Sequence, residues 1–128
     1  MRDDIFIYVG RNASDQLMSF CQKRGFGSLM LVVDDNTYTA AGQQLEERLK
    51  SSGFDVKVAY LTGEEITATE DYFIQVMLAT GDEDRTFVAV GSGSITDITR
   101  FVSFHRRSNF IAYPTAASVD GYTSAGAP

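Results

Sequence analysis

Short apolar runs alternate with longer segments of helical periodicity along the chain, and this alternation constrains the fold more than any other feature. In the segment before residue 53, for example, Ala41, Leu45 and Leu49 recur at helical spacing. The order repeats four times and predicts an α/β fold, a Rossmann-like parallel sheet covered by helices in three αβα layers. The predicted strands are residues 5–9, 29–33, 55–60, 86–90 and 110–113.

Local signals predict where the helices begin and end. Ser14 is predicted to cap a helix that ends at Gly25. Gly53 is predicted to end the next helix, the one that contains Leu45 and Leu49. Thr67 and Glu70 have the spacing of a capping box ahead of a further helix ending near residue 81. Residues 82–85 are predicted to form a polar turn before the fourth strand.

Size and charge restrict the function classes. A chain of 128 residues fits one domain, residues 1–128, and its 44% apolar and 22% charged residues are typical of a globular protein. The net charge of -6 argues against a nucleic-acid partner. The one basic cluster, Arg100 with His105, Arg106 and Arg107, is interpreted as a solvated helix end rather than a phosphate site.

The single cysteine and the amino-terminal residues indicate a cytoplasmic protein without a membrane segment. Cys21 has no cysteine partner for an internal disulfide, and its place beside Leu17 and Phe20 on a predicted helix face makes it a core residue. The first residues carry no apolar signal segment, and no run is long enough to span a bilayer.

Ligands of open parallel sheets bind beyond the carboxyl ends of the strands, so the residues that follow each strand are the candidates for a site. Asp34 follows the second strand, where a carboxylate can accept hydrogen bonds from a ribose diol and repel a 2′-phosphate. The alternative is that Asp34, Asp35 and Asn36 form only a turn and a helix cap. The sequence alone leaves both interpretations open.

A glycine-containing loop follows the fourth strand. Gly91, Ser92, Gly93 and Ser94 precede a helix, so backbone amides there could bind a pyrophosphate, although a plain tight turn would explain the glycines too. The loop lacks a third glycine and comes after the candidate ribose acid, which excludes the ordinary Rossmann arrangement. After the fifth strand, residues 114–121 offer hydroxyls and one carboxylate with little bulk around them.

Together these segments resemble the N-terminal domain of the family that joins glycerol-1-phosphate dehydrogenases, glycerol dehydrogenase, iron-containing alcohol dehydrogenases and 3-dehydroquinate synthase. The resemblance is carried by Gly-Ser-Gly-Ser-Ile-Thr-Asp-Ile-Thr-Arg at 91–100, Pro-Thr-Ala-Ala-Ser-Val-Asp-Gly-Tyr-Thr-Ser at 114–124 and Val-Asp-Asp-Asn-Thr at 33–37. Gly121 after the acid is typical of the bacterial glycerol-1-phosphate branch. Ser92 and Arg100 depart from the glycine and lysine that the family often has there.

The resemblance implies a dehydroquinate synthase-like domain that binds NAD or NADP. Asp34 would hold the adenosine ribose, the 91–94 loop the pyrophosphate, and Thr115 and Ser118 would lie near the nicotinamide. Asp97 and Asp120 would stand at the nicotinamide and substrate end, with Asp120 contacting a substrate hydroxyl or the carboxamide. The implied cofactor-binding set is Asp34, Gly91, Ser92, Gly93, Ser94, Asp97, Thr115, Ser118 and Asp120, and the implied catalytic residues are Asp97 and Asp120.

The resemblance also implies a divalent metal, Zn, Ni or Fe, bound by an aspartate and two histidines of a helical C-terminal domain that residues 1–128 do not include. No metal ligand is expected in this chain, because a lone His105 among arginines is usually structural or solvated. The implied full-length enzyme reduces dihydroxyacetone phosphate to glycerol 1-phosphate, and this chain alone is expected to be inactive.

Three alternatives remain open from the sequence: a glycerol or other polyol dehydrogenase, a non-catalytic nucleotide-binding module, and a 3-dehydroquinate synthase-like lyase. The expected partners are the nicotinamide dinucleotide and a small polyol or polyol-phosphate substrate. Apolar surface left exposed on a single domain also predicts self-association, so we expect a homo-oligomer.

Overall fold

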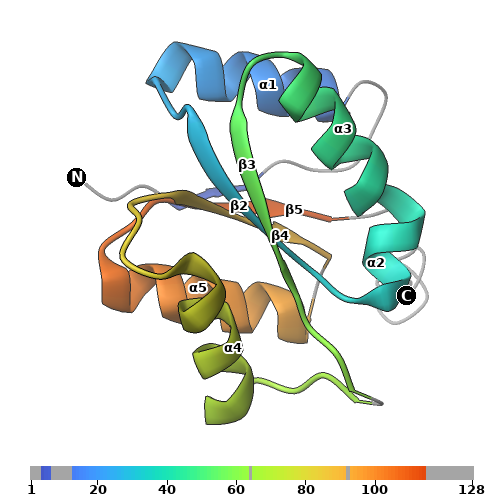
Figure 1. The fold of residues 1–128 in the computed structure, drawn as a ribbon, viewed down its shortest axis with the longest axis vertical. Helices are drawn as coiled ribbons and strands as arrows, with labels where there is room; N and C mark the ends of the chain where they lie inside the picture. Colours follow the sequence, from blue (N-terminus) through green and yellow to red (C-terminus); the bar gives the residue numbers. More distant parts are fainter. Residues whose placement is uncertain (1–3, 7–12, 64, 92, 115–128) are drawn as a thin grey trace, which may run out of the picture.

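Five parallel strands form one twisted sheet in the computed structural model, which describes residues 4–6, 13–63, 65–91 and 93–114 (Figure 1). The spatial order of the strands is β1-β5-β4-β2-β3. The prediction of a parallel α/β sheet is therefore confirmed. The strands are β1 (Asp4–Phe6), β2 (Ser28–Val33), β3 (Asp55–Tyr60), β4 (Thr86–Val90) and β5 (Phe110–Tyr113).

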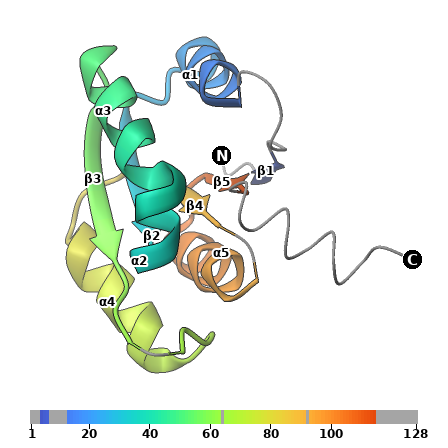
Figure 2. The same cartoon turned by 90° about the vertical axis from the view of Figure 1, so that its right-hand side faces the viewer.

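Helices cover both faces of the sheet, which gives the three αβα layers (Figures 1 and 2). Residues of α1 and α3, such as Leu17 and Leu49, pack against one face of the strands in the first core. Residues of α4 and α5, such as Val76 and Ile98, pack against the other face with Met30. The helical elements are α1 (Ala13–Arg24), α2 (Asp35–Thr37), the π-helical turn η1 (Tyr38–Gly42), α3 (Gln43–Ser51), α4 (Glu70–Thr80) and α5 (Ser94–Arg106).

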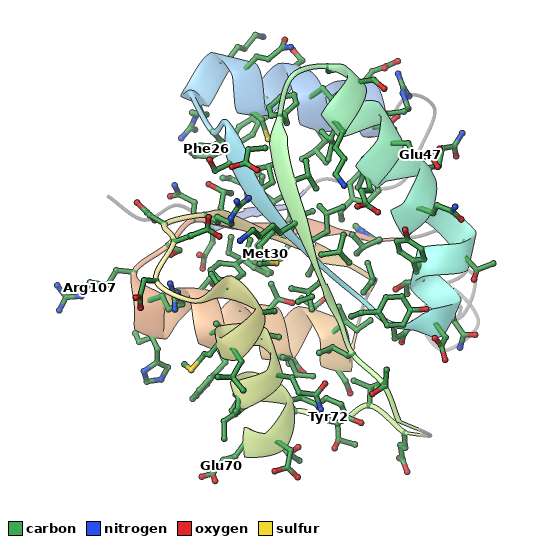
Figure 3. All side chains as sticks on the ribbon, viewed as in Figure 1. Phe26, Met30, Glu47, Glu70, Tyr72 and Arg107 are labelled. Atoms are coloured by element: carbon green, nitrogen blue, oxygen red, sulfur yellow. The ribbon has the colours of Figure 1, made fainter. Side chains whose placement is uncertain are left out.

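The central strands are apolar on both faces because both faces are covered by helices. Leu29 to Val33 of β2 and Phe87 to Val90 of β4 are fully buried. Met30 lies inside the molecule, whereas Glu47 on α3 and Arg107 just after α5 extend outward (Figure 3). The continuous apolar runs in the sequence are therefore explained by burial in the middle of the sheet.

The chain reverses its direction of winding between β2 and β4. From β2 it continues through α3 to β3 on one face of the sheet, and from β4 it continues through α5 to β5 on the other face. Because β2 and β4 are neighbours, the connections that leave their carboxyl ends diverge. Such a divergence opens a crevice where ligands of open α/β sheets bind.

Two predicted helix caps are wrong. The first helix begins at Ala13, so Ser14 lies inside it, and its hydroxyl instead accepts a hydrogen bond from Arg48. The fourth helix begins at Glu70 after Thr69, whose side chain makes no capping hydrogen bond. Thr67 lies two residues before the N-cap position, in a turn where its carbonyl accepts from the amide of Thr69, so it does not cap the helix.

The described residues bear on three further expectations, one of them only in part. The first strand is described only as Asp4–Phe6, and residues 7–9 lie outside the described part. Cys21 is fully buried in the first core, as predicted, and this burial raises the pKa of its thiol to about 11. Across the described segments, no helix combines the length and apolar character needed to cross a bilayer.

Candidate functional site

Asp34 directly follows β2 and caps the short helix α2. Its Oδ1 atom accepts a hydrogen bond of 2.8 Å from the backbone N–H of Thr37, and the Thr37 hydroxyl accepts one of 2.9 Å from the backbone N–H of Asp34. The pair forms a reciprocal capping box, so the interpretation of Asp34 as a helix cap is confirmed. Within the described residues, the second carboxylate oxygen, Oδ2, has no hydrogen-bond partner and is left available.

Gly91 lies at the end of β4 and joins the ends of three strands. Its backbone N–H donates to the carbonyl of Tyr113 at the end of β5, at 3.1 Å. Its φ of 144° is a conformation that favours glycine, and a Cβ there would stand 3.1 Å from Thr37 Cγ2 and 3.2 Å from Ile95 Cδ1. A side chain at Gly91 would therefore be both strained and tightly packed, and Gly91 lies against Thr37, the residue bonded to Asp34.

Gly93 is the residue before α5 and leaves the start of this helix uncapped. It has a φ of 58°, no side chain to accept from the first-turn amides, and open space where a Cβ would lie. Its carbonyl accepts from the backbone N–H of Asp97 at 3.0 Å, as in a regular first turn. Among the described residues, the amides at the start of α5, including that of Ser94, thus have no side-chain cap, which is the arrangement that favours an anion.

The structure brings Asp34, Gly91, Gly93 and Ser94 to the carboxyl edge of the two central strands, at the switch point. Asp97 lies in the exposed first turn of α5, where it lines a groove with Arg100, Phe101 and Phe104. Four other predicted site residues, Ser92, Thr115, Ser118 and Asp120, lie outside the described residues. The bond between Gly91 and Tyr113 shows that β5 ends at the same edge.

Two tyrosines beside Asp34 were not predicted as part of this edge. Tyr60, the last residue of β3, donates a hydrogen bond of 2.6 Å to Asp35, and this bond raises the pKa of its hydroxyl. Tyr38 packs edge-to-face on Tyr60 with 5.4 Å between the ring centroids and donates to Glu46 at 2.8 Å. The contact arises from the register of β2 and β3, which pairs Val33 with Tyr60 and which only the structure shows.

These contacts separate the two acids that follow β2. Asp35 is held by Tyr60 on the side of β3, whereas the bonds of Asp34 within the described part of the chain are those of its own capping box. Asp34 is half-buried and Asp35 is exposed. Each carboxylate thus keeps one oxygen without a partner among the described residues, and the two acids differ in what holds the other oxygen and in burial.

The remaining candidate groups do not form a metal site in the described part. Across residues 4–6, 13–63, 65–91 and 93–114, no three histidine, cysteine or acidic side chains cluster as metal ligands would. His105 instead lies against aromatic rings, 4.3 Å from the centroid of Phe101 and 5.6 Å from that of Phe104. In the basic cluster, Arg100 contacts Asp4 and Arg106 bonds the carbonyl of Glu83, which fits the predicted helix end.

Comparison with solved structures supports the fold. Glycerol dehydrogenase from Schizosaccharomyces pombe superposes with a TM-score of 0.67 at 21% identity, over 89% of this chain and 30% of that one. A 2-deoxy-scyllo-inosose synthase superposes with a TM-score of 0.66 at 17% identity, over 85% of this chain and 32% of that one. At these identities the similarity concerns the fold alone.

Sequence comparison gives the family. The glycerol-1-phosphate dehydrogenase [NAD(P)+] of Bacillus subtilis is 42% identical over 125 residues, which are 95% of this chain and 32% of that protein. The protein of the same name from Methanosphaerula palustris is 36% identical over 92% of this chain and 32% of its own length. The chain spans about a third of the length of these relatives. Residues 8–128 match the family model for iron-containing alcohol dehydrogenases, and the chain belongs to that family.

Proposed function

We propose that this chain is the NAD(P)-binding domain of a metal-dependent glycerol-1-phosphate dehydrogenase-like oxidoreductase. The observation that carries the proposal is the meeting of two complementary groups at the switch point. A carboxylate with an open oxygen, Asp34, follows β2, and an uncapped helix start, at Gly93, follows the neighbouring strand β4. A dinucleotide needs both, an acceptor for its ribose hydroxyls and donors for its pyrophosphate.

The described residues fit such a ligand. The Oδ1 atom of Asp34 is fixed by the Thr37 amide, which leaves Oδ2 to accept from a ribose hydroxyl. Gly91 and Gly93 have no side chains that would keep a pyrophosphate from the first amides of α5. The proposal assigns Ser92 to the same loop, Thr115 and Ser118 to the nicotinamide, and Asp97 and Asp120 to the nicotinamide and substrate end.

The roles of this chain are binding and orientation. The dinucleotide, when bound, supplies the hydride that reduces the ketone of dihydroxyacetone phosphate to glycerol 1-phosphate. The divalent metal would be held by residues beyond this chain. The residues of the 1–128 domain would place the dinucleotide along the carboxyl edge of the sheet, with its adenosine beside Asp34.

Calorimetric titration with NADH tests the proposal directly. The folded chain should bind NADH, and Asp34→Asn should weaken binding because it removes the ribose acceptor's charge while asparagine still caps α2. Asp35→Asn is the matched control, since Asp35 is held by Tyr60 instead. A folded chain that gives no heat with NADH at about millimolar concentration would contradict the proposal, because specific sites saturate well below that.

Two further expectations belong to this proposal. The chain alone should show no turnover of dihydroxyacetone phosphate with NADH. Measurable turnover would mean that the catalytic groups lie within this chain and not beyond it. The expected homo-oligomer remains a prediction, supported by the exposed apolar side chains of Ile74, Leu78, Phe101 and Phe104 on α4 and α5. Sedimentation equilibrium tests it, and a monomer at all concentrations would contradict it.

A further inference from the structure

We propose that Thr37 is a positioning residue that couples the ribose-binding acid to the phosphate-binding turn. The inference rests on the proposed dinucleotide site and gives a role to Thr37, a residue to which the family resemblance assigns none. Thr37 is only 7% exposed, so a ligand would not reach it. It acts instead through two neighbours, Asp34 on one side and Gly91 on the other.

The hydroxyl of Thr37 fixes Asp34. Its Oγ1 atom accepts the backbone N–H of Asp34 at 2.9 Å, while its own backbone N–H donates to Asp34 Oδ1 at 2.8 Å. These two bonds hold the main chain and the carboxylate of Asp34 in one orientation. Because Oδ1 is occupied, the acid presents Oδ2 in a fixed position, and a preorganised acceptor loses less entropy when it binds a ligand.

The methyl group of Thr37 supports the turn at Gly91. A Cβ on Gly91 would lie 3.1 Å from Thr37 Cγ2, so the methyl group closes the space beside the Gly91 backbone. The other sides of this turn are held by Ile95 and by two bonds, from Gly91 N–H to Tyr113 and from the Thr96 hydroxyl to the Gly91 carbonyl. Thr37 is thus the contact that ties the turn to the end of β2.

The two contacts use different atoms of one side chain, so substitutions can separate them. Thr37→Val keeps the shape and a methyl at the Cγ2 position but removes the hydroxyl. Thr37→Ser keeps the hydroxyl but removes the methyl group. Each variant therefore keeps the contact that the other variant loses.

The test uses two probes, adenosine, which has the ribose without phosphate, and ADP, which adds the pyrophosphate. Thr37→Val should weaken both probes by the same factor, about threefold to tenfold, the value of one hydrogen bond. Thr37→Ser should leave adenosine unchanged and weaken ADP about fourfold, the value of one buried methyl group. Dissociation constants from NMR titration of the folded chain provide the measurement.

Thr80 provides the matched control. It is buried, and its hydroxyl bonds the carbonyl of Val76 within α4, away from the switch point. Thr80→Val and Thr80→Ser should change the free energy of unfolding without changing the affinity for either probe. If the role of Thr37 were purely structural, Thr37→Ser would likewise change the affinities for adenosine and ADP by the same factor or leave both unchanged.

The outcomes distinguish the two proposals. A folded wild-type chain that binds neither ADP nor NADH would overturn the proposed function. If the wild-type chain binds both ligands, two results would overturn the coupling by Thr37. One is that the Thr37 variants bind adenosine and ADP as the wild type does. The other is that Thr37→Val and Thr37→Ser each weaken adenosine and ADP by the same factor. The split between the two probes supports it.

Discussion

The two edges of the sheet use their polar groups in opposite ways. At the amino edge, the side chain of Arg85 is only 2% exposed and donates to the carbonyls of Leu29 and Asp55, both at 3.0 Å. It also pairs with the carboxylates of Asp55 and Glu83. One guanidinium group thus ties the starts of β2, β3 and β4 together, and its donors are directed to protein acceptors.

The carboxyl edge leaves polar groups open. In the part of the chain that the structure describes, one carboxylate oxygen of Asp34 has no partner, and the start of α5 after Gly93 has no side-chain cap. These groups lie beyond the carboxyl ends of the strands, where ligands of open α/β sheets bind, so they are available to a ligand. From this comparison we infer that the paired polar groups of the amino edge serve stability, and the proposed binding belongs to the edge where polar groups are left open.

Removing Arg85 should have the largest effect on stability. Arg85→Ala should lower the free energy of unfolding by about 3 kcal/mol, the lower end for a broken buried ion pair, because Asp55 and Glu83 keep access to water. Urea unfolding measures it. The control is Arg48→Ala, which removes an exposed pair with Asp15 and should cost less than about 1 kcal/mol. Equal losses in the two variants would remove the distinction between the edges.

Filling the turn at Gly91 should come next. Gly91→Ala places a Cβ against Thr37 and Ile95 at a φ that alanine avoids, so it should cost about 1 to 3 kcal/mol and also weaken NADH binding. Urea unfolding and calorimetry measure the two effects. Gly27→Ala is the control, since a Cβ there meets nothing within 4 Å, and it should change neither. A Gly91→Ala variant with unchanged NADH affinity would separate this turn from the site.

Acid should weaken the amino edge through Glu83. Its bonds with Arg85 and Lys57 lower the pKa of its carboxyl from 4.5 to about 2. A lowered folded-state pKa stabilises the fold above pH 4.5, and this contribution is lost as pH falls from about 4.5 to about 2. Thermal unfolding across this range should show a smaller loss for Glu83→Gln than for the wild type. Parallel curves for both proteins would show that Glu83 contributes nothing to the acid sensitivity.

The smallest effect is expected at the thiol near the amino edge. Cys21 lines a hollow with Phe26 and Phe54, between the ends of α1 and α3, but its burial raises the pKa of the thiol to about 11. Two pKa units mean roughly a hundredfold less thiolate, so a disulfide reagent should label the folded chain far more slowly than the unfolded chain. Rapid labelling of the folded chain would indicate that this hollow opens and is a second accessible site.

Much of the fold was predictable because its signals are local. The strands at 29–33, 55–60, 86–90 and 110–113 and a helix after residue 94 were predicted from local patterns, and the structure agrees with them. The polar turn at 82–85 was read the same way, but Arg85 proved to be buried. Nothing local distinguishes it from a solvated arginine, because its acceptors on Leu29 and Asp55 lie 56 and 30 residues away in the sequence.

The candidate site likewise has a part that local sequence patterns predicted and a part that only the structure shows. Asp34 and the 91–94 loop were identified because they follow apolar runs, and the rule for parallel strands places them at one edge. The capping role of Asp34 was one of two open interpretations, and only the contacts with Thr37 settled it. The bond between Tyr60 and Asp35 was missed because it joins β3 to the helix after β2.

The sequence by itself determined the order of strands and helices, the parallel sheet and the residues that follow each strand, because these depend on neighbours a few positions apart. The tertiary structure decided which of those residues meet. The contact of Thr37 with Gly91 and the burial of Arg85 depend on the spatial order of β2, β3 and β4, which brings distant segments within bonding distance. Such contacts require the packed sheet, so local sequence patterns carry no direct signal for them.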